Sequence, residues 1–295
     1  MLPLLRLFRF VVNHPVNKNH RIAAIRDLLK WQLGSRLVPG EVVFNWIEGT
    51  KLVVTNGEAG LTGNVYSGLH EFEDMGFLLH FLRPADNFFD IGSNRGSYTV
   101  LASGVCRATT IAFEPIPATF AKLRANVRIN DLDDLVTPMN VGLGDRQCNL
   151  WFSESLDAAN HIVEVDTNIS KVSVPVVRLD DATSLVPALI KIDVEGFEMS
   201  VFSGATRILS NNDLKGLIVE INESGAKYGY SDRDLICLLN KYGFRAFSYN
   251  PRVRLLKESS VGSQCSGNVL FLRDLPYIEN RIQTAKRFAV RSIFV

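Results

Sequence analysis

Hydrophobic and polar positions alternate with two different periods along the chain. Short apolar runs bounded by polar, Gly or Pro residues predict strands, and apolar residues three and four apart predict helices. From residue 87 to 272 the two patterns follow one another repeatedly, which indicates an α/β fold with a mostly parallel, seven-stranded sheet covered by helices on both faces. The predicted strands are 87–91, 109–113, 136–141, 188–194, 216–222, 244–249 and 268–272, with an inserted antiparallel pair at 148–153 and 172–177; the predicted helices are 70–82, 116–130, 197–209 and 232–242.

The first 67 residues have a different pattern. Residues 2–12 are apolar with Arg6 and Arg9 interspersed, which predicts a helix that packs on the domain or on a subunit partner, or that contacts a membrane interface. This run is too short to span a bilayer. Residues 21–33 predict a second helix, 41–55 a hairpin, and 56–68 a loop beside a pocket. We therefore expect an N-terminal helical and hairpin extension at 1–67, a core domain at 68–274 and a C-terminal tail at 275–295.

Composition narrows the range of functions. The 295 residues are 46% hydrophobic and 21% charged, with a net charge of +1. The protein therefore has no large positive electrostatic field to attract nucleic acid, and no nucleic-acid partner is expected. The five histidines show no metal-ligand spacing, and the cysteines are far apart without a CxxC pair (Cys106, Cys148, Cys237 and Cys265). Isolated thiols are typical of a reducing compartment, so a cytoplasmic location is expected.

Residues 87–101, NFFDIGSNRGSYTVL, read as a strand, a tight turn and the start of a helix. This is the pattern of a nucleotide-binding βα turn, in which Gly92 and Gly96 let backbone N–H groups approach a ligand. A dinucleotide-binding fingerprint has glycine where this chain has Asp90, whose carboxylate repels a pyrophosphate but suits an ammonium or hydroxyl group. The turn therefore favours S-adenosylmethionine over NAD. Asn94 is expected either to bind the ligand or to stabilise the loop.

Several polar groups follow the predicted strands, at the edge where ligands bind in an open α/β sheet. Glu114 comes about 24 residues after Asp90, near the spacing of an acid that binds ribose hydroxyls. In 189–198, LIKIDVEGFE, the ionisable residues Lys191, Asp193 and Glu195 share one side of an otherwise apolar strand. Buried charges are paired or functional, so a structural ion pair of Lys191 and a catalytic role both fit this segment.

The ordered set DIGSNRGSYT, AFEPIPATFAKLRANVRIN, NVGLGD, VVRLDD, LIKIDVEGFE and NVLFLRD resembles the FkbM-type family of S-adenosylmethionine-dependent methyltransferases, over about residues 68–274. The resemblance implies a Rossmann-like class I methyltransferase fold with an antiparallel final strand. It also implies O-methylation of a hydroxyl on a sugar, glycolipid or polyketide-like natural product. Carried over by motif, it implies a cofactor loop of Asp90, Gly92, Asn94 and Gly96, a ribose acid at Glu114, an adenine border at Gly142 and Leu143, and Asp193 beside the methionine end.

Methyl transfer to a hydroxyl requires that the oxygen be held in line and that its proton be accepted. Asp193 or Glu195 is the expected base, and Glu220 on the next strand end is the alternative, with Asn222 and Glu223 beside it. The same carboxylates are also able to hold a divalent cation through oxygen ligands.

Other features of the chain leave alternatives open. His70 and Glu71 either start a helix or reach the substrate, and His161 is either a base or solvated. A small-molecule or glycan acceptor is expected, selected by residues 1–67 and 154–170, and an oligomer is an open alternative. Two rival functions remain: an NAD-dependent oxidoreductase or epimerase on the same fold, and a non-catalytic nucleoside-binding or scaffold protein.

Overall fold

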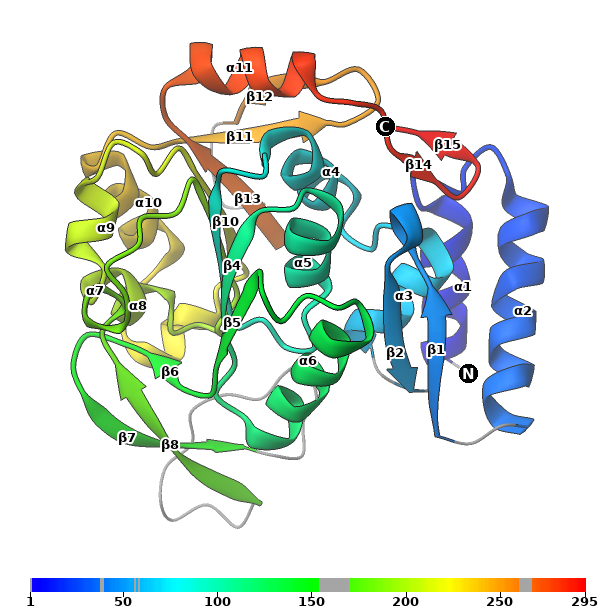
Figure 1. Ribbon diagram of the computed structural model, residues 1–295, viewed down its shortest axis with the longest axis horizontal. Coiled ribbons are helices and arrows are strands. Elements are labelled where there is room, and N and C mark those ends of the chain that lie inside the picture. Colours follow the sequence, from blue (N-terminus) through cyan, green and yellow to red (C-terminus); the bar gives the residue numbers. More distant parts are fainter. Residues whose placement is uncertain (1, 38–39, 56, 58, 154–169, 260–266) are drawn as a thin grey trace.

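The computed structural model describes residues 2–37, 40–55, 57, 59–153, 170–259 and 267–295, and it is built around one eight-stranded sheet (Figure 1). The strand order is β12-β11-β13-β10-β9-β3-β4-β5. From β5 to β10 the strands are parallel, and β13 lies antiparallel between β10 and β11. The strands are β3 (Asn87–Ile91), β4 (Thr109–Phe113), β5 (Val136–Met139), β9 (Leu189–Ile192), β10 (Gly216–Ile221), β11 (Arg245–Asn250), β12 (Leu255–Glu258) and β13 (Gly267–Leu272).

The predicted class and the antiparallel final strand are confirmed, but the expected number of seven strands is wrong by one. The additional strand, β12, pairs antiparallel with β11 at the edge of the sheet. Its sequence lacks the buried apolar alternation that identifies a strand, since Leu255 is 62% exposed.

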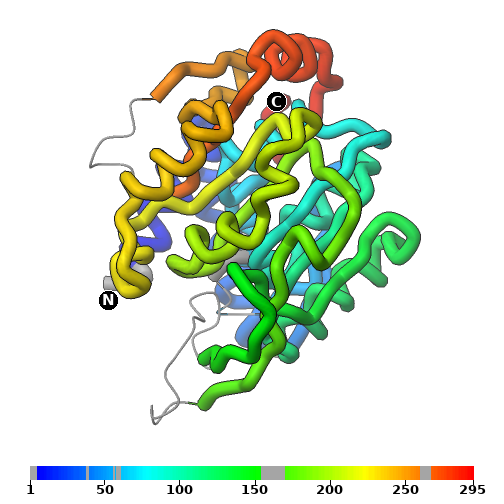
Figure 2. The backbone as a smooth tube through the Cα atoms, turned by 90° about the vertical axis from the view of Figure 1, so that its left-hand side faces the viewer, coloured from blue at the N-terminus to red at the C-terminus, as the bar shows by residue number. Residues whose placement is uncertain are grey.

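Both faces of the sheet are covered, which explains why its strands read as nearly continuous apolar runs. In β3, Phe88 packs into one hydrophobic cluster and Phe89 into the other, because successive side chains point to opposite faces. One face carries α4 (Phe72–Phe81), α5 (Ser97–Val100), the π-helical turn η2 (Leu101–Val105), α6 (Pro117–Ile129) and α11 (Leu275–Thr284). The other carries α7 (Leu179–Ala182), α8 (Glu198–Ser203), α9 (Thr206–Ser210) and α10 (Asp232–Lys241), which lie toward the viewer in Figure 2.

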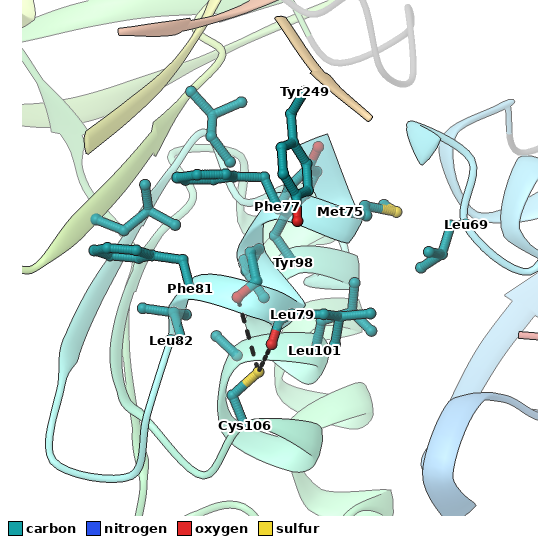
Figure 3. Packing of buried hydrophobic residues seen from close by; sticks show 14 of the residues in the cluster. Leu69, Met75, Phe77, Leu79, Phe81, Leu82, Tyr98, Leu101, Cys106 and Tyr249 are labelled. Carbon is teal, nitrogen blue, oxygen red and sulfur yellow. Dashed lines mark hydrogen bonds between the residues drawn. The ribbon is translucent and has the colours of Figure 1, made fainter. Parts of the chain in front are cut away.

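Helix α4 packs its aromatic residues against the sheet and the α5–η2 segment (Figure 3). Phe77 and Phe81 are stacked with ring centroids 5.4 Å apart, and Tyr249 meets Phe77 edge-on. The Cys106 thiol points at the carbonyl groups of α4, with Sγ 3.8 Å from the Leu79 oxygen. Burial raises the pKa of Cys106 to about 12, so this thiol stays protonated. The three cysteines of the described chain are free, and Cys265 lies outside it.

The N-terminal residues form two packed helices, a hairpin and a third helix. Their bounds are α1 (Leu2–Asn13), α2 (Arg21–Leu37), β1 (Glu41–Asn45), η1 (Ile47–Gly49), β2 (Lys51–Thr55) and α3 (Ala59–Ser67). The hairpin is confirmed, with Asn45 paired to Lys51. The predicted loop at 56–68 is wrong, because burial of Leu61 and Val65 against β2 overrides the weak helix propensity of this Gly- and Asn-containing segment. Among the described residues, no helix has both the length and the apolar character needed to cross a bilayer.

The side chain of Asn126, fully buried on α6, joins the hairpin to the core domain. Its Oδ1 accepts a hydrogen bond from the Val53 N–H at 2.7 Å, and its Nδ2 donates to the Arg95 carbonyl at 2.8 Å. Nearby, Asn130 accepts from the Lys51 N–H at 2.7 Å. A single amide therefore holds β2 and the loop after β3 at fixed positions.

The remaining elements lie around the sheet. The predicted antiparallel pair is confirmed as β7 (Cys148–Ser153) and β8 (Lys171–Val177), and β6 (Gly142–Leu143) pairs with β8. Residues 275–295 contain α11, β14 (Ala289–Val290) and β15 (Ile293–Phe294), and η4 (Ser224–Tyr228) follows β10. The single helix predicted at 197–209 is wrong: it is interrupted at Gly204, where a Cβ would lie 2.0 Å from the Gly144 oxygen. Asp180 covers the start of α9, accepting from the Arg207 and Ile208 N–H groups.

Candidate active site

The turn after β3 is packed so closely that its glycines have no room for a side chain. Gly92 has a φ of +71°, and a Cβ there would lie 1.9 Å from the Asp193 carbonyl oxygen. Gly96 has a φ of +83°, and a Cβ there would lie 2.5 Å from a methyl of Leu123. The Gly92 N–H is bound by the Phe113 carbonyl at 3.0 Å. The turn thus fits between the ends of β4 and β9, where only glycine adopts this backbone without strain.

Asp90 is 2% exposed at the end of β3. Its Oδ2 accepts a hydrogen bond from the Thr99 hydroxyl at 2.6 Å, and Lys191 lies opposite it on β9. Burial raises the pKa of Asp90 to about 6, against the lowering effects of Thr99 and Lys191. The carboxylate is therefore held beneath the turn as a buried negative group.

Glu114 ties the turn to the end of β4. It is 5% exposed, and its carboxylate accepts hydrogen bonds from the Asn94 and Ile116 N–H groups, both at 2.9 Å. Burial raises the pKa of Glu114 to about 8, although both N–H groups lower it. Asn94 itself has a φ of +50° and takes part in this contact through its backbone.

At the end of β9, Lys191 and Asp193 form an ion pair, with Nζ and Oδ2 2.8 Å apart. Lys191 is 4% exposed and also lies 5.3 Å from the ring centre of Tyr98. Burial alone would lower the pKa of Lys191, but the negative charges of Asp193 and Glu71 raise it above its ordinary value. The same ammonium group holds the pKa of Asp193 below its ordinary value despite burial. The pair is charged, as the sequence pattern of this strand suggested.

Glu220, on β10, lies next to Asp193 at the end of the neighbouring strand. Burial and the negative charge of Asp193 raise the pKa of Glu220 to about 8, which favours its protonated form at neutral pH. Burial and Asp193 also raise the pKa of Glu195, which adopts a φ of +54° beyond the strand end. The three carboxylates offer oxygens within 4.8 Å of one another. Since Lys191 already supplies a positive charge to this cluster, we assign no cation to it.

A cavity of about 320 Å³ joins these groups, within the range of about 300–1,000 Å³ typical of small-molecule sites. Nine of the site residues expected from the sequence line this cavity: Asp90, Gly92, Asn94, Glu114, Gly142, Leu143, Asp193, Glu195 and Glu220. Gly96 shapes the turn without lining the cavity, and Asn222 and Glu223 are exposed outside it. His161 and residues 154–169 lie outside the described part of the chain.

The cavity has two chemically different ends. Near Glu114 its wall is apolar, formed by Ile116, Val141, Leu143 and Phe152. The other end carries His70, Glu71 and Tyr98 beside the cluster of Asp193, Glu195 and Glu220. Sequence reasoning did not single out Tyr98 or Phe152, because an aromatic residue within a helix or strand gives no signal that it faces a ligand.

A glycine turn after β3, an acid after β4 and polar groups at the ends of β9 and β10 are the arrangement in which proteins of the Rossmann-like α/β class bind nucleosides. The family model described as the methyltransferase FkbM domain matches residues 90–246. Because this match spans more than half of the chain, the protein belongs to the FkbM methyltransferase family. The resemblance stated from the motifs is thereby confirmed.

Two curated relatives are also methyltransferases. Hexuronic acid methyltransferase AglP of Haloferax volcanii is 30% identical over 168 residues, which cover 56% of this chain and 65% of that protein. Methyltransferase 1 of Beauveria bassiana is 34% identical over 148 residues, covering 41% of this chain and 59% of that protein. The chain thus spans less than two thirds of the length of both relatives.

Among solved structures, methyltransferase FkbM from Methylobacillus flagellatus aligns with a TM-score of 0.46 and 16% identity, covering 85% of this chain and 60% of that chain. TYW2 of M. jannaschii, solved in complex with AdoMet, aligns with a TM-score of 0.40 and 10% identity, covering 79% and 84%.

Proposed function

We propose that this protein is an S-adenosylmethionine-dependent O-methyltransferase that acts on a hydroxyl of a sugar, glycolipid or polyketide-like acceptor. The observation that carries the proposal is that one cavity contains both the Asp90 glycine turn with Glu114 and the carboxylate cluster at the ends of β9 and β10. The first part suits a nucleoside, and the second suits proton removal from an acceptor. Membership of a methyltransferase family supports the same reaction class.

The residues present fit S-adenosylmethionine. Glu114 is buried at the cavity wall, and its side-chain oxygens offer hydrogen-bonding capacity for a ribose hydroxyl besides the bonds that they accept from the Asn94 and Ile116 N–H groups. Ile116, Leu143 and Phe152 offer the apolar sides that a purine ring requires. Asp193 lines the cavity, and its Oδ1, which lies outside the ion pair with Lys191, offers a hydrogen-bond acceptor for an ammonium group. When bound, this cofactor supplies an electrophilic methyl group on a sulfonium centre.

The chain's own contribution to the reaction is to hold the acceptor hydroxyl and receive its proton. At neutral pH Glu220 is protonated and Asp193 is neutralised by Lys191, so neither is a free base. Glu195 lines the same cavity, and burial raises its pKa, which makes its carboxylate a stronger base than an exposed glutamate. We therefore assign proton acceptance to Glu195, and orientation of the acceptor hydroxyl to the Asp193–Glu220 pair.

The charge of the acceptor end favours a neutral hydroxyl acceptor over a carboxylate. Glu71, Asp193 and Glu195 contribute negative groups there, whereas Lys191 is paired with Asp193 and Arg95 is the other basic residue of the cavity wall. An anionic acceptor would be brought close to like charges. The relative named a hexuronic acid methyltransferase supports a sugar-derived acceptor, and the acidic wall favours a sugar that carries no carboxylate of its own.

Calorimetric titration with S-adenosylmethionine, S-adenosylhomocysteine and NAD tests the cofactor. Binding of the first two without NAD is the expected result. NAD binding alone would support an oxidoreductase or epimerase, and binding of no nucleoside would support a scaffold protein.

Transfer of a labelled methyl group to a panel of neutral and uronic sugars then tests the reaction, before and after exhaustive chelation. Transfer to a neutral sugar that survives chelation is expected. Glu195→Gln should lower turnover by about 10²–10⁴-fold, the contribution typical of general base catalysis. The matched control Glu258→Gln, which removes a carboxylate of an exposed ion pair with Arg245, should leave turnover unchanged. Equal turnover of the two variants would remove Glu195 from the role of base.

A further inference from the structure

Helix α2 has two apolar stripes on opposite sides. One stripe faces the molecule: Ala24 is 2% exposed and Leu28 is 5% exposed. The other faces outward: Ile22 is 87% exposed, Leu29 55%, Leu33 64% and Leu37 81%. At 100° per residue the outward residues lie within one sector of the helix, about opposite the buried pair. A surface helix ordinarily carries polar residues on its outer side, so the outward stripe requires a separate explanation.

The neighbouring helix also exposes apolar side chains. Helix α1 packs beside α2 (Figure 1), with Val11 buried between them and the core. On its outer side Leu5 is 50% exposed and Phe8 is 41% exposed. We refer to the exposed apolar side chains of these two packed helices together as the α1–α2 face: Leu5, Phe8, Ile22, Leu29, Leu33 and Leu37.

Positive charge is concentrated on the same two helices. Residues 1–37 contain seven of the 32 Lys and Arg residues but one of the 31 acidic residues, so they carry +6 and the rest of the chain carries −5. Arg9 on α1 and Lys30 on α2 are exposed beside the apolar stripe. The single acidic residue, Asp27, is bound by Arg26 and by Arg291. Although the whole chain has a net charge of only +1, its first 37 residues are therefore strongly basic as well as apolar.

We propose that the α1–α2 face lies on the surface of a bilayer rich in anionic phospholipid. Apolar side chains flanked by Arg and Lys on an amphipathic helix are the combination that binds the interfacial region of such a bilayer. A second copy of this chain is a poorer occupant, because a symmetric dimer through this face would bring Arg9 and Lys30 of both copies into one interface. The face binds the membrane surface without spanning the bilayer.

Flotation of the full chain with vesicles tests this proposal independently of methyl transfer. Phosphatidylcholine vesicles with a third of phosphatidylglycerol are compared with phosphatidylcholine alone, at low and high salt. Binding to the anionic vesicles that weakens at high salt is expected, since surface charges are screened. Arg9→Gln/Lys30→Gln should weaken binding about 25-fold, at ~5-fold for each charge removed.

Two further variants separate apolar contact with the bilayer from a general change in hydrophobicity. Leu29→Ser/Leu33→Ser should lower vesicle binding by at least about tenfold. The control Val253→Ser/Leu255→Ser changes two side chains that are each 62% exposed elsewhere, and should bind as the wild type does. Circular dichroism checks that each variant is folded.

Three results would overturn the proposal. One is failure of the wild type to float with anionic vesicles, and another is equal binding of the stripe and control variants. The third is a dimer in size-exclusion chromatography that Leu29→Ser/Leu33→Ser converts to a monomer, which would assign the face to a second copy.

Discussion

Replacing Gly92 by alanine should destabilise the protein and abolish nucleoside binding. Two costs add. A non-glycine residue with positive φ costs roughly 1–2 kcal/mol, and forcing a methyl group into a packed site costs about 1–3 kcal/mol. The second cost applies fully, because the nearest atom is the Asp193 backbone oxygen at 1.9 Å rather than a flexible side chain. Gly92→Ala should therefore lower the free energy of unfolding by about 2–5 kcal/mol.

Gly243→Ala is the matched control. Gly243 has a φ of +81°, close to the +71° of Gly92, but no atom lies within 4 Å of the position of its Cβ. Alanine there should cost only the backbone strain of about 1–2 kcal/mol. The loss of unfolded-state entropy is the same in both variants and cancels in the comparison.

Urea unfolding measures the two costs, and calorimetric titration with S-adenosylmethionine measures binding. We expect Gly92→Ala to be the less stable variant by about 1–3 kcal/mol and to lose binding, while Gly243→Ala binds normally. Equal destabilisation together with intact binding by Gly92→Ala would refute the conclusion that the turn requires close contact with Asp193.

Three other perturbations give separate tests. Asn126→Ala removes one hydrogen-bond partner each from a buried N–H and a buried carbonyl, and should cost about 2–4 kcal/mol in urea unfolding; a loss below 1 kcal/mol would contradict the role of this amide. Lys191→Met removes the ion-pair partner of the partly exposed Asp193 carboxylate. The free energy of unfolding should fall by about 2–3 kcal/mol at neutral pH, which is below the range for a fully buried pair. Acidification protonates Asp193 and should reduce this loss. Because the pKa of Glu220 is raised from 4.5 to about 8, the folded state binds this proton more tightly than the unfolded state, so the stabilisation is present at low pH and is lost as pH rises to 8. Glu220→Gln removes that loss, so its stability relative to the wild type should increase between pH 5 and pH 8, and a constant difference would contradict the raised pKa.

Elements that bury one continuous apolar run were predictable from the sequence. Residues 87–91 and 109–113 form strands with the predicted bounds, because Asn87 and Thr109 follow clear breaks and the runs end in polar residues. The convergence of Asp90 and Glu114 was predictable for the same reason, since Asp90 lies at the end of β3 and Glu114 follows β4, and the carboxyl ends of these parallel strands meet at one edge.

Features that depend on contacts between distant parts of the chain were not predictable from the sequence. The pKa of Glu220 is raised by burial and by the charge of Asp193. Asp193 is its neighbour because β10 pairs with β9 in the register that places Val219 opposite Ile192. No local pattern specifies that register. Helix α3 forms because Leu61 and Val65 find a core against β2, although the composition of its segment favours a loop.

The two hydrogen bonds of Asn126 couple the hairpin to the glycine turn. The Val53 N–H and the Arg95 carbonyl share one side-chain amide, so the loop that follows β3 cannot move far without disturbing a backbone hydrogen bond on β2. Occupancy of the cavity should therefore slow hydrogen exchange at Val53, a residue that does not line it. The exchange rate of this one amide is therefore expected to respond to binding at the glycine turn.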